Sequence, residues 1–125
     1  MYQTASDYGY FYIRTNEYWD TYNACKTGTS LWLPERENAY NAIEIKQGKF
    51  IIVIKLDSRI IKKTETQLHE YFSNLGFHIY FDGGTEFYKK DIIDCIVSYL
   101  INNNIGHYIL TENEINALIR KPKII

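Results

Sequence analysis

The sequence predicts an α+β fold in which a small, mainly antiparallel three-stranded sheet is flanked by helices. Segments rich in aromatic and β-branched residues, which favour strands, concentrate in the first half of the chain. Apolar residues at helical spacing dominate the second half, and this separation is typical of α+β proteins. The 125 residues contain no internal repeat and no Pro/Gly/Ser-rich linker, so we expect one domain over residues 1–125.

The predicted sheet begins with a hairpin. Residues 10–15 and 22–26 are rich in strand-forming side chains, and the polar residues 16–20 are expected to connect them. Residues 50–56 form a near-continuous apolar run, which predicts a central strand covered on both faces. A short edge strand over 77–81 and a turn over 82–84 are expected later in the chain.

The first predicted helix begins near Leu33, with Pro34 in its first turn, and extends to about Ile43. Helical spacing of 3.6 residues places four of its residues on one face. These residues are Arg36, Ala39, Tyr40 and Ile43. Gly48 is expected to separate this helix from the following strand.

The second predicted helix has clear end signals. Thr64 and Gln67 have the spacing of a capping box, and Gly76 is placed to end the helix. Glu65 precedes the apolar stripe by one turn, so its carboxylate is expected close to the buried edge. The stripe consists of Leu68, Tyr71, Phe72 and Leu75.

Two further helices are predicted near the C-terminus. The first is marked by Ile92, Ile93, Ile96, Val97 and Leu100. The second begins at a capping box formed by Thr111 and Glu114, and Pro122 helps to end it. Its apolar residues are Ile115, Leu118 and Ile119.

Composition limits the classes of protein to which the chain can belong. No apolar run approaches the roughly 20 residues of a membrane-spanning helix, and we expect a soluble intracellular protein without a membrane partner. Cys25 and Cys95 are too few for a disulfide scaffold and are expected to be reduced. A net charge of −1 is unusual for a free-standing nucleic-acid-binding protein, so such a function would need affinity from another domain or subunit.

Five features follow one another along the chain: GYFYIRTN at residues 9–16, CKTG at 25–28, Arg36, ETQLH at 65–69 and GTEFY at 84–88. Their order and spacing resemble those of the GIY-YIG endonucleases, particularly a branch common in phages and large DNA viruses. GYFYIRTN at residues 9–16 resembles the first family strand, whose catalytic tyrosine would be Tyr12. CKTG at residues 25–28 resembles the KIG form of the second motif and places Lys26 where many members have tyrosine. Arg36 follows Gly28 at the spacing of the family's catalytic arginine, and Tyr40 stands where many members have histidine.

The resemblance continues in the second half of the chain. ETQLH at residues 65–69 resembles a family helix whose glutamate, Glu65 here, binds a divalent metal, and GTEFY at residues 84–88 resembles the following segment. The similarity spans about residues 9–101 and leaves a helical extension of about 102–125. Similar segments stand at the N-termini of large viral helicase-like proteins, so the resemblance suggests a tether to such a protein.

The resemblance implies a metal-dependent endonuclease that hydrolyses DNA phosphodiester bonds with Mg²⁺ or Mn²⁺. Glu65 would bind the metal, and Arg36 would present a planar charged group to the phosphate. Tyr12 would accept a proton from water, assisted by Lys26. Because a phenol has an unperturbed pKa of about 10, neighbouring cations would have to lower the pKa of Tyr12.

Contacts to the DNA backbone are expected from basic residues that flank the site. The predicted nucleic-acid-binding residues are Lys26, Arg36, Lys62, Lys63, Lys89 and Lys90. The three histidines, His69, His78 and His107, lack the spacing of zinc ligands and are expected to make ordinary polar contacts.

Alternatives remain for the residues and for the function. Tyr10 competes with Tyr12 for the catalytic position, and Glu86 competes with Glu65 for the metal. A catalytically silent module that binds nucleic acid or protein is a second function, favoured by the pI near 6.3 and by the absence of an equivalent of the family's late asparagine. An enzyme with Cys25 as nucleophile is a third, but it lacks an assignable histidine partner.

Overall fold

The computed structural model describes residues 7–81 and 84–120. The described strands form one antiparallel sheet in the order β4-β5-β2-β1-β3-β6. The strands are β1 (Tyr8–Thr15), β2 (Ala24–Ser30), β3 (Lys49–Asp57), β4 (His78–Phe81), β5 (Gly84–Lys89) and β6 (Tyr108–Ile109). The helices are α1 (Glu17–Asp20), α2 (Leu33–Ile43), α3 (Ile61–Asn74), α4 (Ile92–Asn102) and α5 (Glu112–Ile119).

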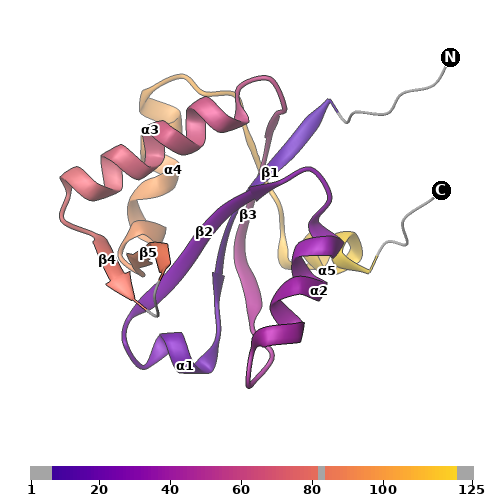
Figure 1. Ribbon diagram of the computed structural model, residues 1–125. Helices are drawn as coiled ribbons and strands as arrows, with labels where there is room; N and C mark the ends of the chain where they lie inside the picture. The colour runs from indigo at the N-terminus through magenta and orange to yellow at the C-terminus, as the bar shows by residue number, and fades with distance from the viewer. Residues whose placement is uncertain (1–6, 82–83, 121–125) are drawn as a thin grey trace, which may run out of the picture.

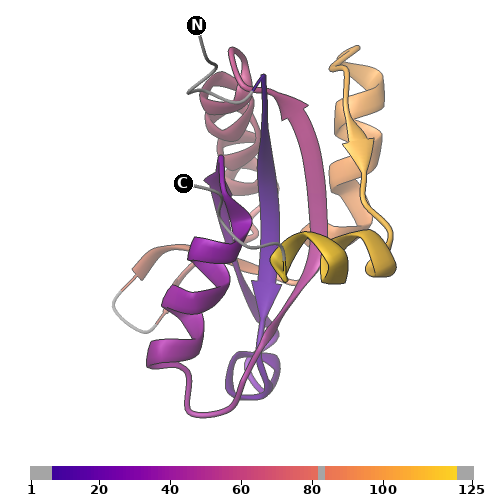
Figure 2. The same ribbon diagram turned by 90° about the vertical axis from the view of Figure 1, so that its right-hand side faces the viewer.

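The helices lie in two layers on opposite faces of the sheet, α3 and α4 on one face and α2 and α5 on the other (Figure 1). Figure 2 shows α5 lying beside α2 and β3, which it contacts. None of the helices in the described part of the chain is long and apolar enough to cross a membrane.

The prediction of a three-stranded sheet is wrong, because the sheet has six strands. β5 extends the sheet beyond β2, and β6 adds two residues beside β3. Neither has a clear signal in the sequence, because β5 begins within the predicted glycine turn and β6 is too short to show a period. The prediction that residues 50–56 form the central strand of the sheet is also wrong. β1 and β2 occupy the middle of the sheet, whereas β3 lies beside β1.

The hairpin of β1 and β2 differs from its prediction in the second strand. β2 spans Ala24–Ser30, whereas the sequence placed it over residues 22–26, so both predicted ends are wrong. Asn23 has a left-handed backbone with φ of 54°, which turns the chain before the strand starts. The predicted connection contains α1, and the side chain of Asn16 caps this helix by accepting a hydrogen bond from the backbone N–H of Trp19.

The bounds predicted for α2 are confirmed at Leu33 and Ile43. The buried residues of this helix are Leu33, Pro34, Glu37 and Tyr40. Arg36, Ala39 and Ile43 are exposed. The helix turns its Glu37 side inward because a buried cation on β1 lies opposite this carboxylate.

The predicted start of α3 is wrong by one turn. The helix begins at Ile61 and contains Thr64, which is buried and does not serve as N-cap. Ile61 is drawn into the helix because its side chain packs in the apolar core and beside Gly9. The predicted end is confirmed, since Gly76 has a left-handed φ of 81° directly after the C-cap residue.

The two C-terminal helices are confirmed. α4 buries Ile92, Ile96 and Leu100, and α5 has the capping box that Thr111 and Glu114 predict. Pro122 and two residues of the predicted turn, Asp82 and Gly83, lie outside the described residues.

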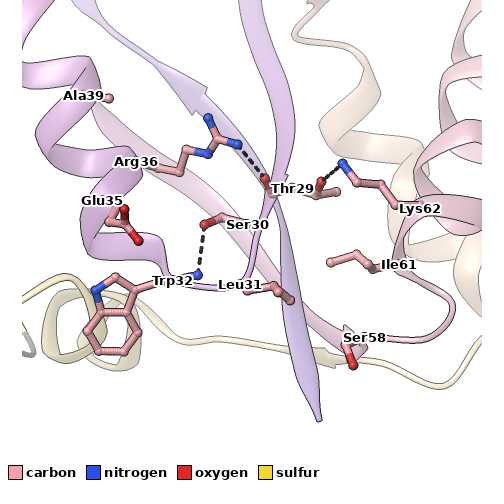
Figure 3. Close-up of a pocket in the computed structure, with 10 residues that line it drawn as sticks. All are labelled: Thr29, Ser30, Leu31, Trp32, Glu35, Arg36, Ala39, Ser58, Ile61 and Lys62. Carbon is pink, nitrogen blue, oxygen red and sulfur yellow. Dashed lines mark hydrogen bonds between the residues drawn. The ribbon is translucent and has the colours of Figure 1, made fainter. Parts of the chain in front are cut away.

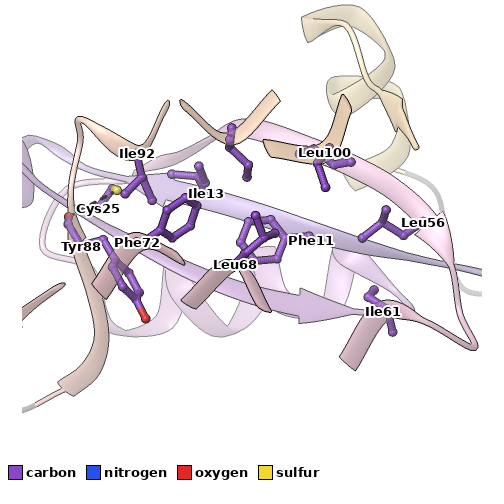
Figure 4. Close-up of a cluster of buried hydrophobic side chains, with 12 residues drawn as sticks. Phe11, Ile13, Cys25, Leu56, Ile61, Leu68, Phe72, Tyr88, Ile92 and Leu100 are labelled. Atoms are coloured by element: carbon purple, nitrogen blue, oxygen red, sulfur yellow. Dashed lines mark hydrogen bonds between the residues drawn. The ribbon is translucent and has the colours of Figure 1, made fainter. Parts of the chain in front are cut away.

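Two apolar clusters fill the space between the sheet and its helix layers. The first, between the sheet and α3 and α4, includes Phe11, Ile13, Leu68 and Phe72 (Figure 4). The second lies between the sheet and α1, α2 and α5. It contains Tyr12, Trp19, Ala24, Leu33, Tyr40, Phe50, Val53, Phe87 and Ile115. Successive residues of β1 therefore alternate between the clusters, and Tyr12 faces α2.

A buried arginine joins β1 to α2. The side chain of Arg14 is fully buried, and its guanidinium donates to Glu37 over 2.6 Å and to Glu44 over 2.8 and 3.1 Å. The rings of Tyr40 and Phe50 lie beside its charge, each with its centroid 4.7 Å from Cζ. Two carboxylates and two rings therefore fix the end of α2 against the sheet.

Replacing Arg14 by alanine should strongly destabilise the protein, because Glu37 and Glu44 would keep their buried charges without a cation. Loss of one partner of a buried ion pair costs about 3 to 5 kcal/mol. Chemical denaturation of Arg14→Ala should show this loss. The control Arg59→Ala removes an exposed pair with Asp57 and should melt like the wild type. Equal stabilities of the two variants would contradict the structural role of Arg14.

Acid should weaken the same network. Burial raises the pKa of Glu44, but hydrogen bonds from Arg14, Asn16 and the Gly48 N–H outweigh it and hold this pKa below its ordinary 4.5. A depressed carboxyl pKa contributes stability above pH 4.5 that is lost as the pH falls through the folded-state value. Denaturation between pH 3 and 7 should therefore show a smaller acid loss for Glu44→Gln than for the wild type. The exposed Glu70→Gln should keep the wild-type slope.

Candidate functional site

One side of β2 is open over half its length. β5 pairs with β2 only from Ala24 to Lys26, and no other described strand pairs with that side of residues 28–30. A cleft of about 840 Å³ lies over this open edge, between α2 and α3 (Figure 3). Its lining residues are Thr29, Ser30, Leu31, Trp32, Glu35, Arg36, Ala39, Ser58, Ile61 and Lys62.

Two cations reach the open edge from opposite walls of the cleft. Arg36 of α2 donates from Nη2 to the carbonyl oxygen of Thr29 over 3.4 Å. Lys62 of α3 donates from Nζ to the hydroxyl of the same threonine over 2.8 Å. Figure 3 shows the two side chains converging on Thr29. An anion in the cleft would therefore meet positive charge from both sides.

Tyr12 lies directly behind this edge, paired with Gly28 across the hairpin. A Cβ added at Gly28 would overlap the hydroxyl of Tyr12, so the glycine makes room for the phenol. The two hydroxyls of Tyr12 and Tyr40 lie 2.9 Å apart and share a hydrogen bond. Both rings are buried, which places the hydroxyl pair beneath the surface near the Arg36 wall.

The electrostatic surroundings of Tyr12 include several predicted site residues. Burial raises the pKa of Tyr12, and this effect outweighs the hydrogen bond with Tyr40 and the charge of Arg36, which lower it. The carboxylates of Glu86 and Glu65 raise the pKa further. The lowered pKa that a role for Tyr12 as a base requires is therefore not found in this structure, where the pKa of Tyr12 is raised.

Glu65 lies on the other wall, on α3. Its side chain is 13% exposed, and its Oε1 is 3.5 Å from the Nζ of Lys62. Through Lys62 and Thr29, Glu65 is therefore connected to the wall that carries Arg36. Tyr12, Arg36 and Glu65 surround one end of β2, although only Arg36 of the predicted catalytic residues lines the cleft itself.

Mg²⁺ or Mn²⁺, the metals that the family resemblance implies, would need carboxylate ligands near the site. In residues 7–81 and 84–120, no group of three or more His, Cys, Asp or Glu side chains could hold an ion as a cage. Mg²⁺ and Mn²⁺ accept carboxylate oxygens, and Mg²⁺ needs only one or two of them with water in the other positions. Glu65 fits this requirement. Glu86, whose charge also acts on Tyr12 and on His69, remains an alternative.

The other predicted residues are distributed more widely. Lys26 lies over the aromatic rings of Tyr40 and Phe87, with Nζ 5.7 and 5.5 Å from their centroids. Lys63 is exposed on α3 beside Lys62. Lys89 pairs with Ala24 at the far end of β2. From the rise per residue of a strand, Ala24 lies roughly 17 Å from Thr29.

Lys90 belongs to that far end as well, because it forms an ion pair with Asp20 of α1 at 2.9 Å. The structure therefore does not bring Lys89 and Lys90 to the cleft. Tyr10 lines a different pocket, together with Lys55 and Tyr108, so Tyr12 is the tyrosine of β1 that lies beside Arg36.

Cys25 is not suited to nucleophilic catalysis in this structure. It is buried, and burial raises the pKa of its thiol to about 12. A thiol with this pKa carries almost no thiolate near neutral pH, and the thiolate is the reactive form.

Sequence reasoning missed the polar residues that support the site. Thr27 bonds through its hydroxyl to Nε2 of His69 at 2.8 Å, and the imidazole stacks on the ring of Tyr88. Thr29 binds both cations of the cleft. The sequence signal was the alternation of threonines with Lys26 and Gly28 in β2, which places the two threonines on one face of the strand.

Comparison with known proteins adds no relative: no protein family, curated protein or solved structure matches the chain.

Gly28→Ala should displace Tyr12 and break its hydrogen bond with Tyr40, because a methyl group has no space at this position. Overpacking of this kind costs about 1 to 3 kcal/mol. Thermal denaturation should show a clear loss of stability. The control Gly106→Ala adds its Cβ in open space and should melt like the wild type. Equal melting of the two variants would contradict the close contact.

Proposed function

We propose that this protein is a metal-dependent endonuclease of the GIY-YIG type that hydrolyses DNA phosphodiester bonds. One observation carries the proposal. Tyr12 and Glu65, more than fifty positions apart, surround the same end of β2 together with Arg36. The charges of Glu65 on α3 and Arg36 on α2 both act on the Tyr12 hydroxyl of β1. The combination of phenol, guanidinium and carboxylate matches what phosphodiester hydrolysis requires.

Arg36 is the principal phosphate ligand in this proposal. It is exposed on α2, and its one hydrogen bond within residues 7–81 and 84–120 is a long one of 3.4 Å to Thr29, so its guanidinium has donors available for a phosphate. Lys62 adds a point charge from the opposite wall. The two residues hold the scissile group between the helices and stabilise the charge that develops on its oxygens.

Tyr12 is the group that accepts a proton from the attacking water, and Tyr40 holds its hydroxyl in place. Two carboxylates raise the pKa of Tyr12, so neutralisation of Glu65 favours the phenolate. Lys26 lies over the Tyr40 ring and keeps positive charge close to the hydroxyl pair. A bound Mg²⁺ or Mn²⁺ would supply charge neutralisation at Glu65 and at the leaving oxygen.

The net charge of the chain limits how strongly the domain alone can bind DNA. A net charge of −1 gives little general attraction to DNA, since such attraction comes from neutralised phosphates. We therefore propose that DNA is delivered by a larger protein to which this domain is tethered, such as a helicase.

The second candidate is a catalytically silent module that binds nucleic acid or protein. The burial that raises the pKa of Tyr12 favours this reading, because a phenol with a raised pKa is a poor base near neutrality. Cleavage activity separates the two candidates.

The nuclease should be tested with supercoiled plasmid in Mg²⁺ or Mn²⁺. Glu65→Gln should fold normally and lose metal-dependent cleavage, with DNA affinity unchanged or slightly raised. Arg36→Ala should reduce the rate by about 10² to 10³ and weaken binding, since it removes a charged donor to the phosphate. Both variants should melt close to the wild type.

Matched controls exist for both substitutions. Glu70→Gln changes an exposed glutamate of the same helix as Glu65, and Arg59→Ala removes an exposed arginine outside the cleft lining. Both controls should cleave like the wild type. If Glu65→Gln and Arg36→Ala also cleave like the wild type, the proposed site is wrong. If purified wild-type protein binds DNA without cutting it in either metal, the silent module replaces the nuclease.

A further inference from the structure

The cleft between α2 and α3 has an apolar part that the chemistry proposed above does not use. Leu31 is 51% exposed at this cleft, and Trp32 beside it is half-buried. Ala39 and Ile61 continue the apolar lining on the two walls. The cleft thus combines an indole and aliphatic groups in an open, accessible position.

Trp32 occupies the N-cap position of α2, where a tryptophan does not stabilise the helix. Its side chain makes no capping hydrogen bond. Ser, Thr, Asp and Asn are the residues that stabilise this position, so tryptophan contributes nothing to the helix as a cap. Capping therefore does not account for an indole at the rim of this cleft.

The charges of the cleft indicate an anionic ligand. Arg36 and Lys62 approach Thr29 from the two walls, and the side chain of Lys62 is 79% exposed. Glu35 is the one carboxylate among the lining residues that the structure describes. A ligand with both a phosphate and a flat apolar group would complement this combination of cations and indole.

We infer that this cleft binds an unpaired nucleotide next to the scissile phosphate, with the phosphate on Arg36 and Lys62 and the base against Trp32. The inference rests on the proposed function and deepens it by naming the substrate class, DNA with an unpaired segment. The volume of about 840 Å³ lies within the range of small-ligand sites. In intact duplex DNA the faces of the bases are stacked on one another and cannot contact an indole.

The test measures binding in EDTA, so that no cleavage can occur. Three fluorescently labelled DNAs of equal length are compared: a single strand, the same strand with abasic sites, and a duplex. The wild type should bind the single strand most tightly. Trp32→Ala should weaken this binding about 5- to 150-fold, the effect of losing one base–aromatic stack. Its affinity for the abasic strand should not change, because phosphate contacts remain.

Tyr80→Ala is the matched control, since Tyr80 is an exposed aromatic residue of β4 outside the cleft lining. It should bind all three DNAs like the wild type. Intrinsic fluorescence gives a second measurement on intact protein, because Trp19 is buried whereas Trp32 is accessible. The single strand should quench this emission, the abasic strand should quench it less, and Trp32→Phe should abolish the difference.

The inference is overturned if Trp32→Ala loses affinity equally for the single strand and the abasic strand, or if duplex binds as tightly as single strand. Absence of quenching by the single strand would overturn it as well. Failure of the proposed function is distinguishable from these outcomes. A protein that shows the Trp32 effect in EDTA but never cleaves in Mg²⁺ or Mn²⁺ binds an unpaired nucleotide without being a nuclease.

Discussion

The buried ion pairs of Arg14 are the interaction on which the arrangement of this site depends. Arg14 belongs to β1, and its two carboxylate partners lie near the middle and at the end of α2. The pairs therefore set both the position and the rotation of this helix. Glu37 faces the sheet, and as a consequence Tyr40 lies over Tyr12 and Arg36 is left facing the cleft. Arg14, which has no role in the proposed chemistry, thus determines where Tyr40 and Arg36 lie.

Incomplete strand pairing is the second constraint. β5 extends the sheet beyond β2 for only three residue pairs, and the remaining edge of β2 is left to side chains from α2 and α3. Backbone groups at such an edge need partners, and charged side chains are a common way to keep an edge from pairing with another strand. Here Arg36 and Lys62 serve this purpose and remain exposed to the cleft. The same feature therefore protects the fold and provides positive charge at a surface.

The electrostatic balance at Tyr12 connects these features to the proposed chemistry. Burial and two carboxylates hold the proton on the phenol, while Tyr40 and Arg36 act in the opposite direction. A carboxylate that loses its negative charge to a cation would shift this balance toward the phenolate. In this structure Tyr12 shares a hydrogen bond with Tyr40, and its pKa is raised above the ordinary value, chiefly by burial.

The sequence by itself determined α2 and α4, the capping box of α5 and the glycine that ends α3, because each depends on contacts between near neighbours in the chain. Its resemblance to a nuclease family also predicts a catalytic group of Tyr12, Lys26, Arg36, Tyr40 and Glu65, which stays a prediction. Only the tertiary structure decided that the sheet has six strands and that Glu37 is buried, because strand pairing and ion pairs join residues far apart in the chain. The tertiary structure also decided that Lys62 lines the cleft and that Lys90 pairs with Asp20 instead. The sequence could not distinguish these lysines, because the residues around an exposed lysine in the chain do not indicate what lies opposite it in the fold.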